Sequence, residues 1–561
     1  MSGYTGPITH IIVVMLENRS YDNMLGWLYN AGNQPPYDKA PAGQTGLNGL
    51  NGGEANPDPN SPGQTITVAN QTADTADPNT GDSYAATTIP IFDPGEPFDD
   101  MAQQILGISS APSTNPYAPS STLYPPDPEH AMQGFTTNYA QLTSLSGQLT
   151  VPAANVPDVM NYFTPAQLPV TAWLANNFAV CDQWFASAPT HTFANRAFAH
   201  CAAPGVTELS GGYSLIDDPQ YFLDLPLRDL PSVFSQLDAA YPDTAGGSPP
   251  NWKVYFHDYM ISAVVTPYVR EKAASSGNVN VATYDDSDWG SETPFSLNVT
   301  LGAVPPTFVD DLSNNKLPMY SFIEPRYSCN FAHNTNSANS NHPGGSSFYD
   351  NAPGSNSPPT DTCDGEVFLM QLYNALRGSD YWDTCLLIIT YDEHGGVYDH
   401  VVPPRSTPPG GTIPDAKDLQ DPASDGFSFN VFGCRVPAIV VSPYVMQGST
   451  ISPPGATPFD HTSIISTVWE CFGLSDTTPA IASLTDRDAA APSLLTLIQS
   501  KVCNDAGQYT ASPPVCSARF ASTPQSPAPT RRGLSQEELA SIWLKRRGGS
   551  KRGGRTPEGR Q

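Results

Sequence analysis

The sequence predicts an α/β fold built on a mainly parallel sheet, and two observations support this prediction. Short continuous apolar runs recur along the chain, as at 11–16 and 386–390, and such runs are typical of strands buried on both faces. Amphipathic segments with helical spacing lie between them, most clearly at 366–385. Because the apolar runs extend from residue 11 to beyond residue 440, the sequence indicates one large domain with long insertions.

The first predicted strand, at 11–16, runs directly into Glu17 and Asn18. It is too short to span a membrane and is better explained as a buried strand. In open α/β sheets the carboxyl ends of the strands carry the ligand sites. The oxygen-bearing side chains that follow this strand are therefore candidates for one half of a site.

Irregular stretches rich in Pro, Gly and Asn interrupt the domain, and the stretch at about 205–315 is aromatic and acidic, with predicted strands and helices but no clear motif. We expect insertions at about 32–125, 205–315 and 329–362 within a single domain over residues 1–520. The remaining segment, 521–561, is basic and rich in Gly and Arg, which predicts a disordered tail.

Two polar residues stand near predicted helix starts. His130 follows a proline-rich turn and precedes a predicted helix, where a lone histidine is either structural or catalytic. Thr192 lies just before a helix predicted to begin at or near Asn195, and a helix N-terminus favours an anion. The Thr192 hydroxyl is then either an N-cap or a nucleophile whose pKa a metal lowers.

The segment 388–404, IITYDEHGGVYDHVVPP, is the most informative stretch of the chain. A buried strand meets Asp392, Glu393 and His394, and two glycines then let the backbone turn sharply. The strand that ends at Glu17 has the same pattern, a buried strand followed by polar residues. Further strands are predicted at 319–328 and 436–445, and a helix follows His461.

Oxygen donors at two strand ends predict a cation site. The candidate ligands are Glu17, Asn18, Asp392 and Glu393, with Thr192 as a third source. All-oxygen coordination suits Ca, Mg or Mn better than zinc, and a metal bound by carboxylates recruits a phosphate. Four histidines would then contact phosphate oxygens or protonate a leaving alkoxide: His130, His342, His394 and His400.

Charge and cysteine usage restrict the partners and the compartment. Lys+Arg 25 against Asp+Glu 54 gives a net charge of −29, and nine of the 25 basic residues follow residue 530, so the main domain is not expected to bind nucleic acid. Cys503 and Cys516 bracket a loop that would suit one local disulfide in an oxidising compartment. High Pro and Gly with few lysines indicates a secreted or periplasmic protein, although no signal peptide is visible.

Five segments, in order, resemble the signature segments of the phosphoesterase family. They are ITHIIVVMLENRSYDN, DPEH, THTFANRAFAH, NHPGG followed by GEVFLMQLYNALRGSDYW, and ITYDEHGGVYDHVVPP. That family joins bacterial and plant non-specific phospholipases C with metal-dependent acid phosphatases. The resemblance runs from about residue 8 to 475. It implies an alkaline-phosphatase-like three-layer sandwich, with residues 1–520 as the catalytic domain.

The resemblance also implies roles for single residues. Glu17, Asn18, Asp392 and Glu393 fall on the family's metal positions, Thr192 on its nucleophile, and His130 and His342 on its phosphate-side histidines. His394 and His400 match the motif; we expect a catalytic role for His394, and substrate binding by His400 and Asn18. The chain departs from the family twice, at the turn of Thr192, which lacks a proline, and at Asn23, where the family has histidine. Thr190 is the competing hydroxyl, and spacing to Asn195 favours Thr192.

The implied activity is metal-dependent phosphoester hydrolysis with a threonine nucleophile. A phospholipase C type reaction on phospholipid headgroup diesters is the first expectation, with one divalent cation as cofactor and transient contact with a membrane surface. The alternative is a broad acid phosphatase that acts on phosphomonoesters, because the same metal site serves both reactions. A different class is a catalytically silent, acidic calcium-binding surface protein.

Overall fold

The computed structural model of the chain describes most of the predicted domain. The described residues are 4–28, 47–76, 83–142, 150–207, 213–214, 216, 228–242, 249–257, 260–274, 281–283, 307–327, 338–343, 360–416, 422–512 and 516. The predicted disordered tail, 521–561, lies outside them. Among the described residues, no helix has both the length and the apolar character needed to cross a bilayer.

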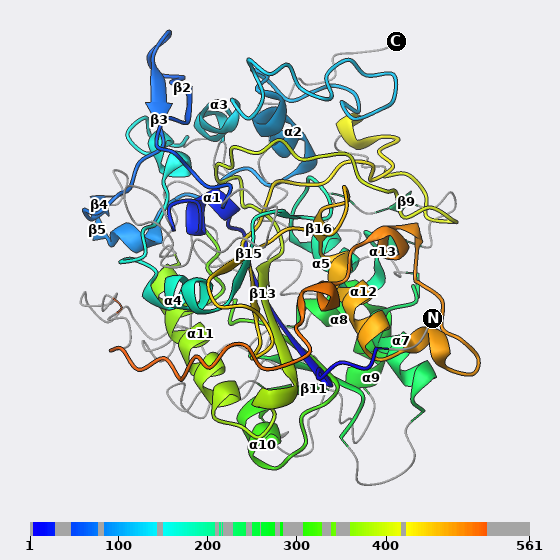
Figure 1. Ribbon diagram of the computed structural model, residues 1–561. Coiled ribbons are helices and arrows are strands. Elements are labelled where there is room, and N and C mark those ends of the chain that lie inside the picture. Colours follow the sequence, from blue (N-terminus) through cyan, green and yellow to red (C-terminus); the bar gives the residue numbers. More distant parts are fainter. Residues whose placement is uncertain are drawn as a thin grey trace, which may run out of the picture.

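An eight-stranded sheet forms the centre of the described structure, in the order β11-β10-β12-β1-β13-β14-β6-β15 (Figure 1). Its strands are β1 (His10–Leu16), β6 (Ala179–Cys181), β10 (Trp252–Phe256), β11 (Val281–Thr283), β12 (Tyr320–Ile323), β13 (Cys385–Tyr391), β14 (Ala438–Val441) and β15 (Ser449–Ile451). Neighbouring strands are parallel except at β14, which is antiparallel to both β13 and β6. The predicted α/β fold with a mainly parallel sheet is confirmed.

Helices cover both faces of the sheet and give three layers. In Figure 1, α4 (Pro169–Asn177) and α11 (Thr362–Arg377) lie on one side of β13, and α5 (Thr192–Cys201), α7 (Val233–Ala240), α8 (Ile261–Val265) and α12 (Thr462–Cys471) lie on the other. Two-sided cover explains why strand β1 is buried from Ile11 to Leu16 and carries an unbroken apolar run.

The remaining elements are short. The helices are α1 (Tyr21–Met24), α2 (Phe98–Leu106), α3 (Phe135–Gln141), α9 (Pro267–Ala274), α10 (Phe308–Ser313) and α13 (Asp486–Ala490). The two-stranded ribbons are β2 (Ala55–Pro57) with β3 (Thr65–Thr67), β4 (Thr75–Ala76) with β5 (Ser83–Tyr84), β7 (Trp184–Phe185) with β16 (Phe459–Asp460), and β8 (Val206–Thr207) with β9 (Tyr213–Ser214).

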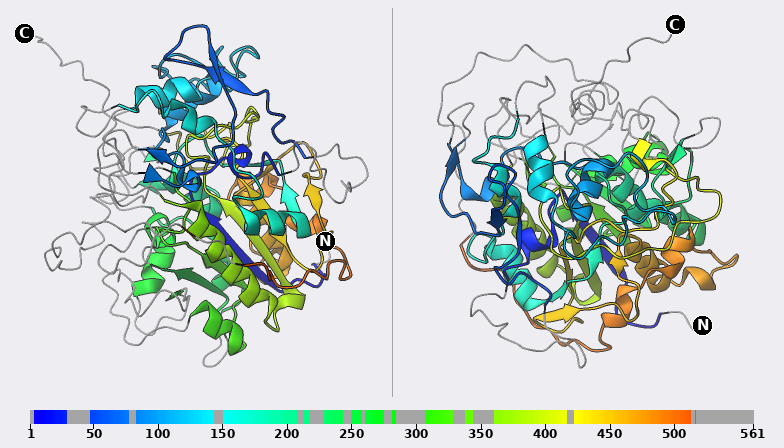
Figure 2. Two further views of the ribbon diagram at one scale, coloured as in Figure 1. Left: turned by 90° about the vertical axis from the view of Figure 1, so that its left-hand side faces the viewer. Right: turned by 90° about the horizontal axis from the view of Figure 1, so that it is seen from above.

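Strand register aligns the two polar strand ends found in the sequence. Leu16 of β1 is paired with Tyr391 of β13, so Glu17 and Asp392 are the next residues on neighbouring parallel strands. Figure 2 (left) shows β1 and β13 side by side. Since parallel strands end at the same edge of a sheet, this register places both polar ends together.

The structure describes parts of two predicted insertions, and one of them differs from the expectation. The described part of 32–125 carries α2, β2 and β3, which lie beyond the carboxyl ends of the central strands (Figure 1). The prediction for 205–315 is wrong in part, because β10 and β11 fall within it and belong to the central sheet. In β10 the apolar run is interrupted by Lys253, whose charge is paired with Asp311, so the sequence shows no continuous apolar strand there.

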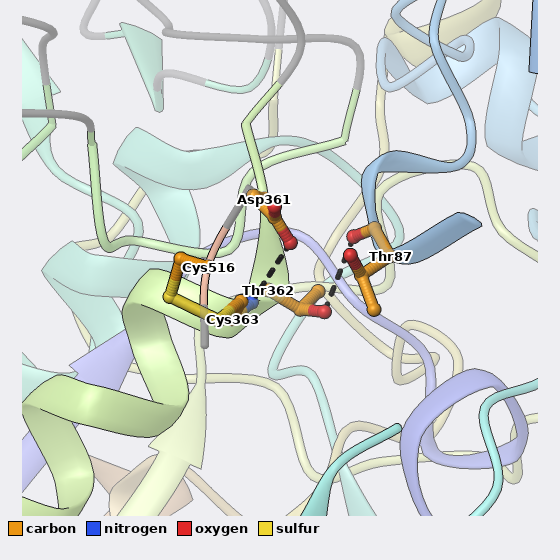
Figure 3. The surroundings of a disulfide bond; sticks show 5 residues. All are labelled: Thr87, Asp361, Thr362, Cys363 and Cys516. Atoms are coloured by element: carbon orange, nitrogen blue, oxygen red, sulfur yellow. Dashed lines mark hydrogen bonds between the residues drawn. A yellow bond between two sulfur atoms is a disulfide. The ribbon is translucent and has the colours of Figure 1, made fainter. Parts of the chain in front are cut away.

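The disulfide links different cysteines from those predicted. Cys516 is bonded to Cys363 at the start of α11 (Figure 3), and Cys503 is an exposed free thiol, so the predicted Cys503–Cys516 pair is wrong. The physical reason is the path of the C-terminal segment, which runs back along α11. Asn374 of that helix donates to the carbonyl of Tyr509 and accepts its N–H.

Candidate active site

The ends of β1 and β13 meet in a cluster of buried carboxylates. Glu17, Asn18, Asp392 and Glu393 all have 0% exposure. Asp392 joins the two strand ends, because its Oδ1 accepts the backbone N–H of Asn18 at 3.1 Å and that of Glu393 at 2.8 Å. The predicted convergence of two distant strand ends is therefore present.

Thr192 brings a hydroxyl to this cluster from the start of helix α5. Helix α5 begins at Thr192, three residues before the predicted start, and the Thr192 hydroxyl donates to Asn18 Oδ1 at 3.4 Å. The competing hydroxyl, Thr190, instead donates to the backbone carbonyl of Ile216 at 2.9 Å. The structure thus places Thr192 rather than Thr190 beside Asn18, at a helix N-terminus that favours an anion.

Asn195 holds the turn that precedes Thr192. Its Oδ1 accepts the N–H of Ala188 at 3.0 Å, and its Nδ2 donates to the carbonyl oxygens of Thr190 at 2.7 Å and His191 at 3.2 Å. Asn195 is completely buried. These bonds fix the turn without the proline that the phosphoesterase motif carries there, so that departure does not loosen the approach to Thr192.

Arg196, one turn along the same helix, had no predicted role. Its Nε lies 3.1 Å from Asp392 Oδ2, and its NH2 group donates to the carbonyl oxygens of Met15 and Leu16, each at 3.2 Å. Burial alone would lower the pKa of Arg196, but Tyr327 and the carboxylates of Asp392, Glu17 and Glu324 raise it above its ordinary value. Arg196 is therefore the buried cation that these acidic residues surround.

His342 lies beside Asn18, as expected for a residue of this site. Its Nε2 is 3.0 Å from Asn18 Nδ2, and the histidine is completely buried. A carboxylate that the sequence did not single out lies against the same amide: Asn18 Nδ2 donates to Glu96 Oε1, which is 3.3 Å from His342 Nε2. Asp93 Oδ1 lies 3.8 Å from His342 Nδ1. Glu96 follows no strand, so no local pattern could have identified it.

His394 is completely buried beside Glu393. Its Nε2 is 2.9 Å from Gln104 Oε1, and its Nδ1 is 3.6 Å from Glu393 Oε2. Gln104 Nε2 donates to the Gly95 carbonyl, so Gln104 Oε1 accepts and His394 Nε2 carries the hydrogen. Burial lowers the pKa of His394 to about 4, which favours the neutral imidazole, and the catalytic role of His394 stays a prediction.

His400 has a different environment from the one expected. Its Nδ1 lies 2.6 Å from Asp22 Oδ2 and its Nε2 lies 3.1 Å from Asn48 Oδ1. Arg435 completes the network with ion pairs of 3.0 Å to Asp22 and to Asp399. Both ring nitrogens of His400 thus contact protein groups, and Asp22 joins α1 to the segment after β13 through this histidine. Substrate binding by His400 stays a prediction.

Two further sequence expectations concern His130 and Asn23. The His130 side chain is 62% exposed, on a turn where its Nδ1 lies 3.8 Å from Asp127. Within the described residues the structure does not bring His130 to Asn18 or Thr192, so its catalytic role stays a prediction. Asn23 donates to the carbonyl of Asn161 at 2.8 Å and fastens α1 to the neighbouring segment.

The chemistry of the donors fits a hard divalent cation. Glu17, Asn18, Asp392 and Glu393 supply carboxylate and amide oxygens at the ends of β1 and β13, and Asn18 contacts both Asp392 and the Thr192 hydroxyl. The carboxylates of Glu17, Asp392 and Glu393 do not themselves form a group with ligand atoms within 4.8 Å of one another. Among the described residues, the compact carboxylate and histidine groups, with ligand atoms within 4.8 Å of one another, are Asp22–Asp399–His400 and Asp93–Glu96–His342. The first already contains the guanidinium of Arg435. The second adjoins Asn18 and belongs to the same site.

Comparison with known proteins gives a consistent result. The model of the Phosphoesterase family matches residues 8–475. Non-specific phospholipase C6 of Arabidopsis thaliana is 31% identical over 87% of this chain and 71% of its own length. Phospholipase C B of Mycobacterium tuberculosis is 26% identical over 84% of this chain and 74% of its own length. The lipoteichoic acid synthase LtaP from Listeria monocytogenes aligns with a TM-score of 0.27 and 15% identity over 60% of this chain and 69% of that chain, a likeness too low to add to the argument.

Proposed function

Because the chain belongs to the phosphoesterase family and is a phosphoric ester hydrolase, we propose that it is a metal-dependent enzyme of the phospholipase C type with Thr192 as nucleophile. The names of its relatives, plant and mycobacterial, support a phospholipid headgroup diester as the substrate. The observation on which the proposal rests is the Thr192 hydroxyl, which reaches Asn18 Oδ1 at 3.4 Å at the meeting point of two acidic strand ends.

Each residue of the site has a separate role in such a reaction. Thr192 Oγ attacks phosphorus while the bond to the diacylglycerol oxygen breaks, which leaves the phosphorylated headgroup on Thr192 until water releases it. A divalent cation held by Glu17, Asn18, Asp392 and Glu393 would lower the pKa of the hydroxyl and neutralise developing charge. The N-terminus of α5 favours the anionic phosphate, and Asn195 keeps Thr192 in place. His342 lies next to Asn18 and contacts its side-chain amide, and the proton that the Thr192 hydroxyl loses ends on the leaving alkoxide.

A pair of threonine variants tests the nucleophile. We expect Thr192→Ala to lower kcat on phosphatidylcholine by about a thousandfold or more, as loss of a covalent nucleophile does. Thr190→Ala removes the neighbouring hydroxyl, which donates to the Ile216 carbonyl, and should keep activity within about tenfold. Circular dichroism of both variants checks that each is folded. A Thr192→Ala protein as active as wild type would exclude the assignment, and with it the covalent step.

Two substrates separate the proposed reaction from its alternative. The wild-type protein should release phosphocholine from phosphatidylcholine in mixed micelles, and should act less well on nitrophenyl phosphate. Hydrolysis of the monoester alone would establish the acid phosphatase instead. No hydrolysis of either substrate would favour the silent calcium-binding protein.

Removal of the metal tests the cofactor. After dialysis against EDTA the enzyme should lose activity, and addition of Ca²⁺, Mg²⁺ or Mn²⁺ in turn should restore it to different extents, which also identifies the preferred ion. Full activity after chelation, in protein shown by elemental analysis to be metal-free, would contradict a metal-dependent mechanism.

The compartment and the membrane contact are also proposed. The Cys363–Cys516 bond supports export to an oxidising environment, because disulfides persist there and are rare in the cytosol. A lipid substrate implies transient contact with a membrane surface, and sedimentation with phosphatidylcholine vesicles would measure it.

A further inference from the structure

We propose that Glu96 is a positioning residue that fixes the orientation of the Asn18 side-chain amide, and through it both the cation site and Thr192. The proposal rests on the proposed function, in which Asn18 is a metal ligand. Glu96 lies in the segment before α2, distant in sequence from every residue of the motifs, and its side chain is 5% exposed.

Two contacts hold the backbone of Asn18 in place. Asn18 adopts φ 58°, the left-handed region that residues other than glycine seldom enter. Its N–H donates to Asp392 Oδ1, and its carbonyl packs so closely against Gly395 that a Cβ on that glycine would lie 2.1 Å from the carbonyl oxygen. A strained residue held by its surroundings is typical of a functional site. The direction of the Asn18 Cβ is fixed by these contacts.

The side-chain amide of Asn18 can still adopt two orientations of nearly the same shape, in which Oδ1 and Nδ2 exchange places. The hydrogen-bond partners of these two atoms determine which orientation is present. The Glu96 carboxylate can only accept a hydrogen bond, and it receives one from Asn18 Nδ2. His342 Nδ1 lies 2.7 Å from the carbonyl oxygen of Pro343, so in the neutral ring Nδ1 carries the hydrogen and Nε2 accepts from Asn18 Nδ2 at 3.0 Å.

This arrangement turns Asn18 Oδ1 towards Thr192. The carbonyl oxygen is the atom that accepts from the Thr192 hydroxyl, and it is the atom that a cation binds. The opposite orientation would present an NH₂ group to the cation, which is repulsive, and the Thr192 hydroxyl would then accept a hydrogen bond from Asn18 and no longer donate one. Groups that orient a metal ligand in this way affect metal affinity without touching the metal.

Glu96 is itself held between two elements. The carbonyl of the preceding Gly95 accepts from Gln104 of α2 at 2.7 Å. On its other side, Gly396 approaches so closely that a Cβ there would lie 2.7 Å from the Gly95 carbonyl oxygen. The carboxylate is thus supported by α2 and by the turn that follows β13, and does not depend on a free loop.

Two substitutions at Glu96 distinguish the effect of losing the hydrogen-bond acceptor from the effect of losing the negative charge. Glu96→Leu removes the acceptor, and binding of Mn²⁺ to the metal-free full-length protein, measured by calorimetry, should weaken by about 10- to 100-fold, with kcat falling more than KM rises. Glu96→Gln keeps an oxygen for Asn18 Nδ2, and its Mn²⁺ affinity should stay within about threefold of wild type.

Asp100→Asn is the matched control. Asp100 is a buried carboxylate four residues further on, and it accepts from the Asn138 amide at 2.6 Å, away from Asn18. This variant should keep both Mn²⁺ affinity and kcat, even if its melting temperature falls. The proposal is overturned if Glu96→Leu binds Mn²⁺ like wild type, if Glu96→Gln is as impaired as Glu96→Leu, or if Asp100→Asn is impaired to the same extent. Absence of Mn²⁺ binding or hydrolysis in the wild type would instead overturn the proposed function, so the two failures are distinguishable.

Discussion

Two buried arginines from distant segments balance the acidic residues of the 388–404 segment. Asp392 is paired with Arg196 of α5, and Asp399 is paired with Arg435, which precedes β14. All four side chains have 0% exposure. Removal of one partner from such a pair costs about 3–5 kcal/mol, because it leaves an uncompensated buried charge. The same carboxylates that make the motif recognisable therefore also fix the packing of α5 and β14 against β13.

His400 extends the second of these networks and gives it a pH dependence. Burial alone would lower the pKa of His400, but the hydrogen bond to Asp22 and the charges of Asp22 and Asp399 raise it above its ordinary value of 6.5. Protonated His400 therefore stabilises the native state below about pH 6.5, and this stabilisation is lost as pH rises through the raised pKa.

We expect the free energy of unfolding of wild type, relative to His400→Gln, to decrease above about pH 6.5. Urea unfolding of both proteins at a series of pH values measures this difference, in which the contributions of other titrating groups cancel. A difference that is constant from pH 5 to pH 9 would show that Asp22 does not shift the histidine.

Among the helices, α4 depends on a side chain from another element. It begins at Pro169 after Leu168, which offers no capping side chain. The Glu366 carboxylate of α11 replaces the cap, since it accepts the N–H groups of Val170 at 2.5 Å and Thr171 at 3.1 Å. The two helices that cover one face of the sheet are thus joined at the N-terminus of α4 by a single buried carboxylate.

Substitution of Glu366 tests this contact. Glu366→Ala should lower the free energy of unfolding by about 2 kcal/mol, because two buried N–H groups lose their acceptor. Glu366→Gln retains one acceptor oxygen and should lose less. Chemical denaturation of the two variants measures the difference, and equal stability of Glu366→Ala and wild type would contradict the capping role.

At the scale of the whole molecule, the C-terminal segment is fastened across the domain. It runs along α11, where Arg377 donates to the carbonyl of Ala506 at 2.7 Å, and it ends in the bond from Cys516 to Cys363. The same helix start contacts the segment before α2, through the Thr362 hydroxyl and the Thr87 carbonyl at 3.2 Å. Figure 3 shows both connections around Cys363. The disulfide therefore joins the end of the domain to the region that carries Glu96.

Loss of the disulfide should destabilise the protein as a whole. Cys516→Ser is expected to lower the free energy of unfolding by about 2–4 kcal/mol, and added reductant should lower the melting temperature of wild type but not of this variant. Cys503→Ser is the control, since Cys503 is an exposed free thiol. A Cys503→Ser protein that melts as early as Cys516→Ser would contradict the pairing, and peptide mapping under non-reducing conditions would identify the true bond.

The sequence by itself determined the strands and the polar residues at their ends. Apolar runs at β1 and β13 are local signals, and parallel strands necessarily bring their carboxyl ends, with Glu17, Asn18, Asp392 and Glu393, to one edge. The fold class and the proximity of Thr192 follow from the same pattern and from the family resemblance.

The tertiary structure alone decided the partners of these residues. Glu96 meets Asn18, Arg196 meets Asp392, and Cys516 meets Cys363 across separations of 78, 196 and 153 residues. It also decided that His400 lies in an ion network and that β14 runs antiparallel. The reason is physical: a periodic pattern reports which face of an element is buried, but it holds no information about which distant side chain will be packed against that face.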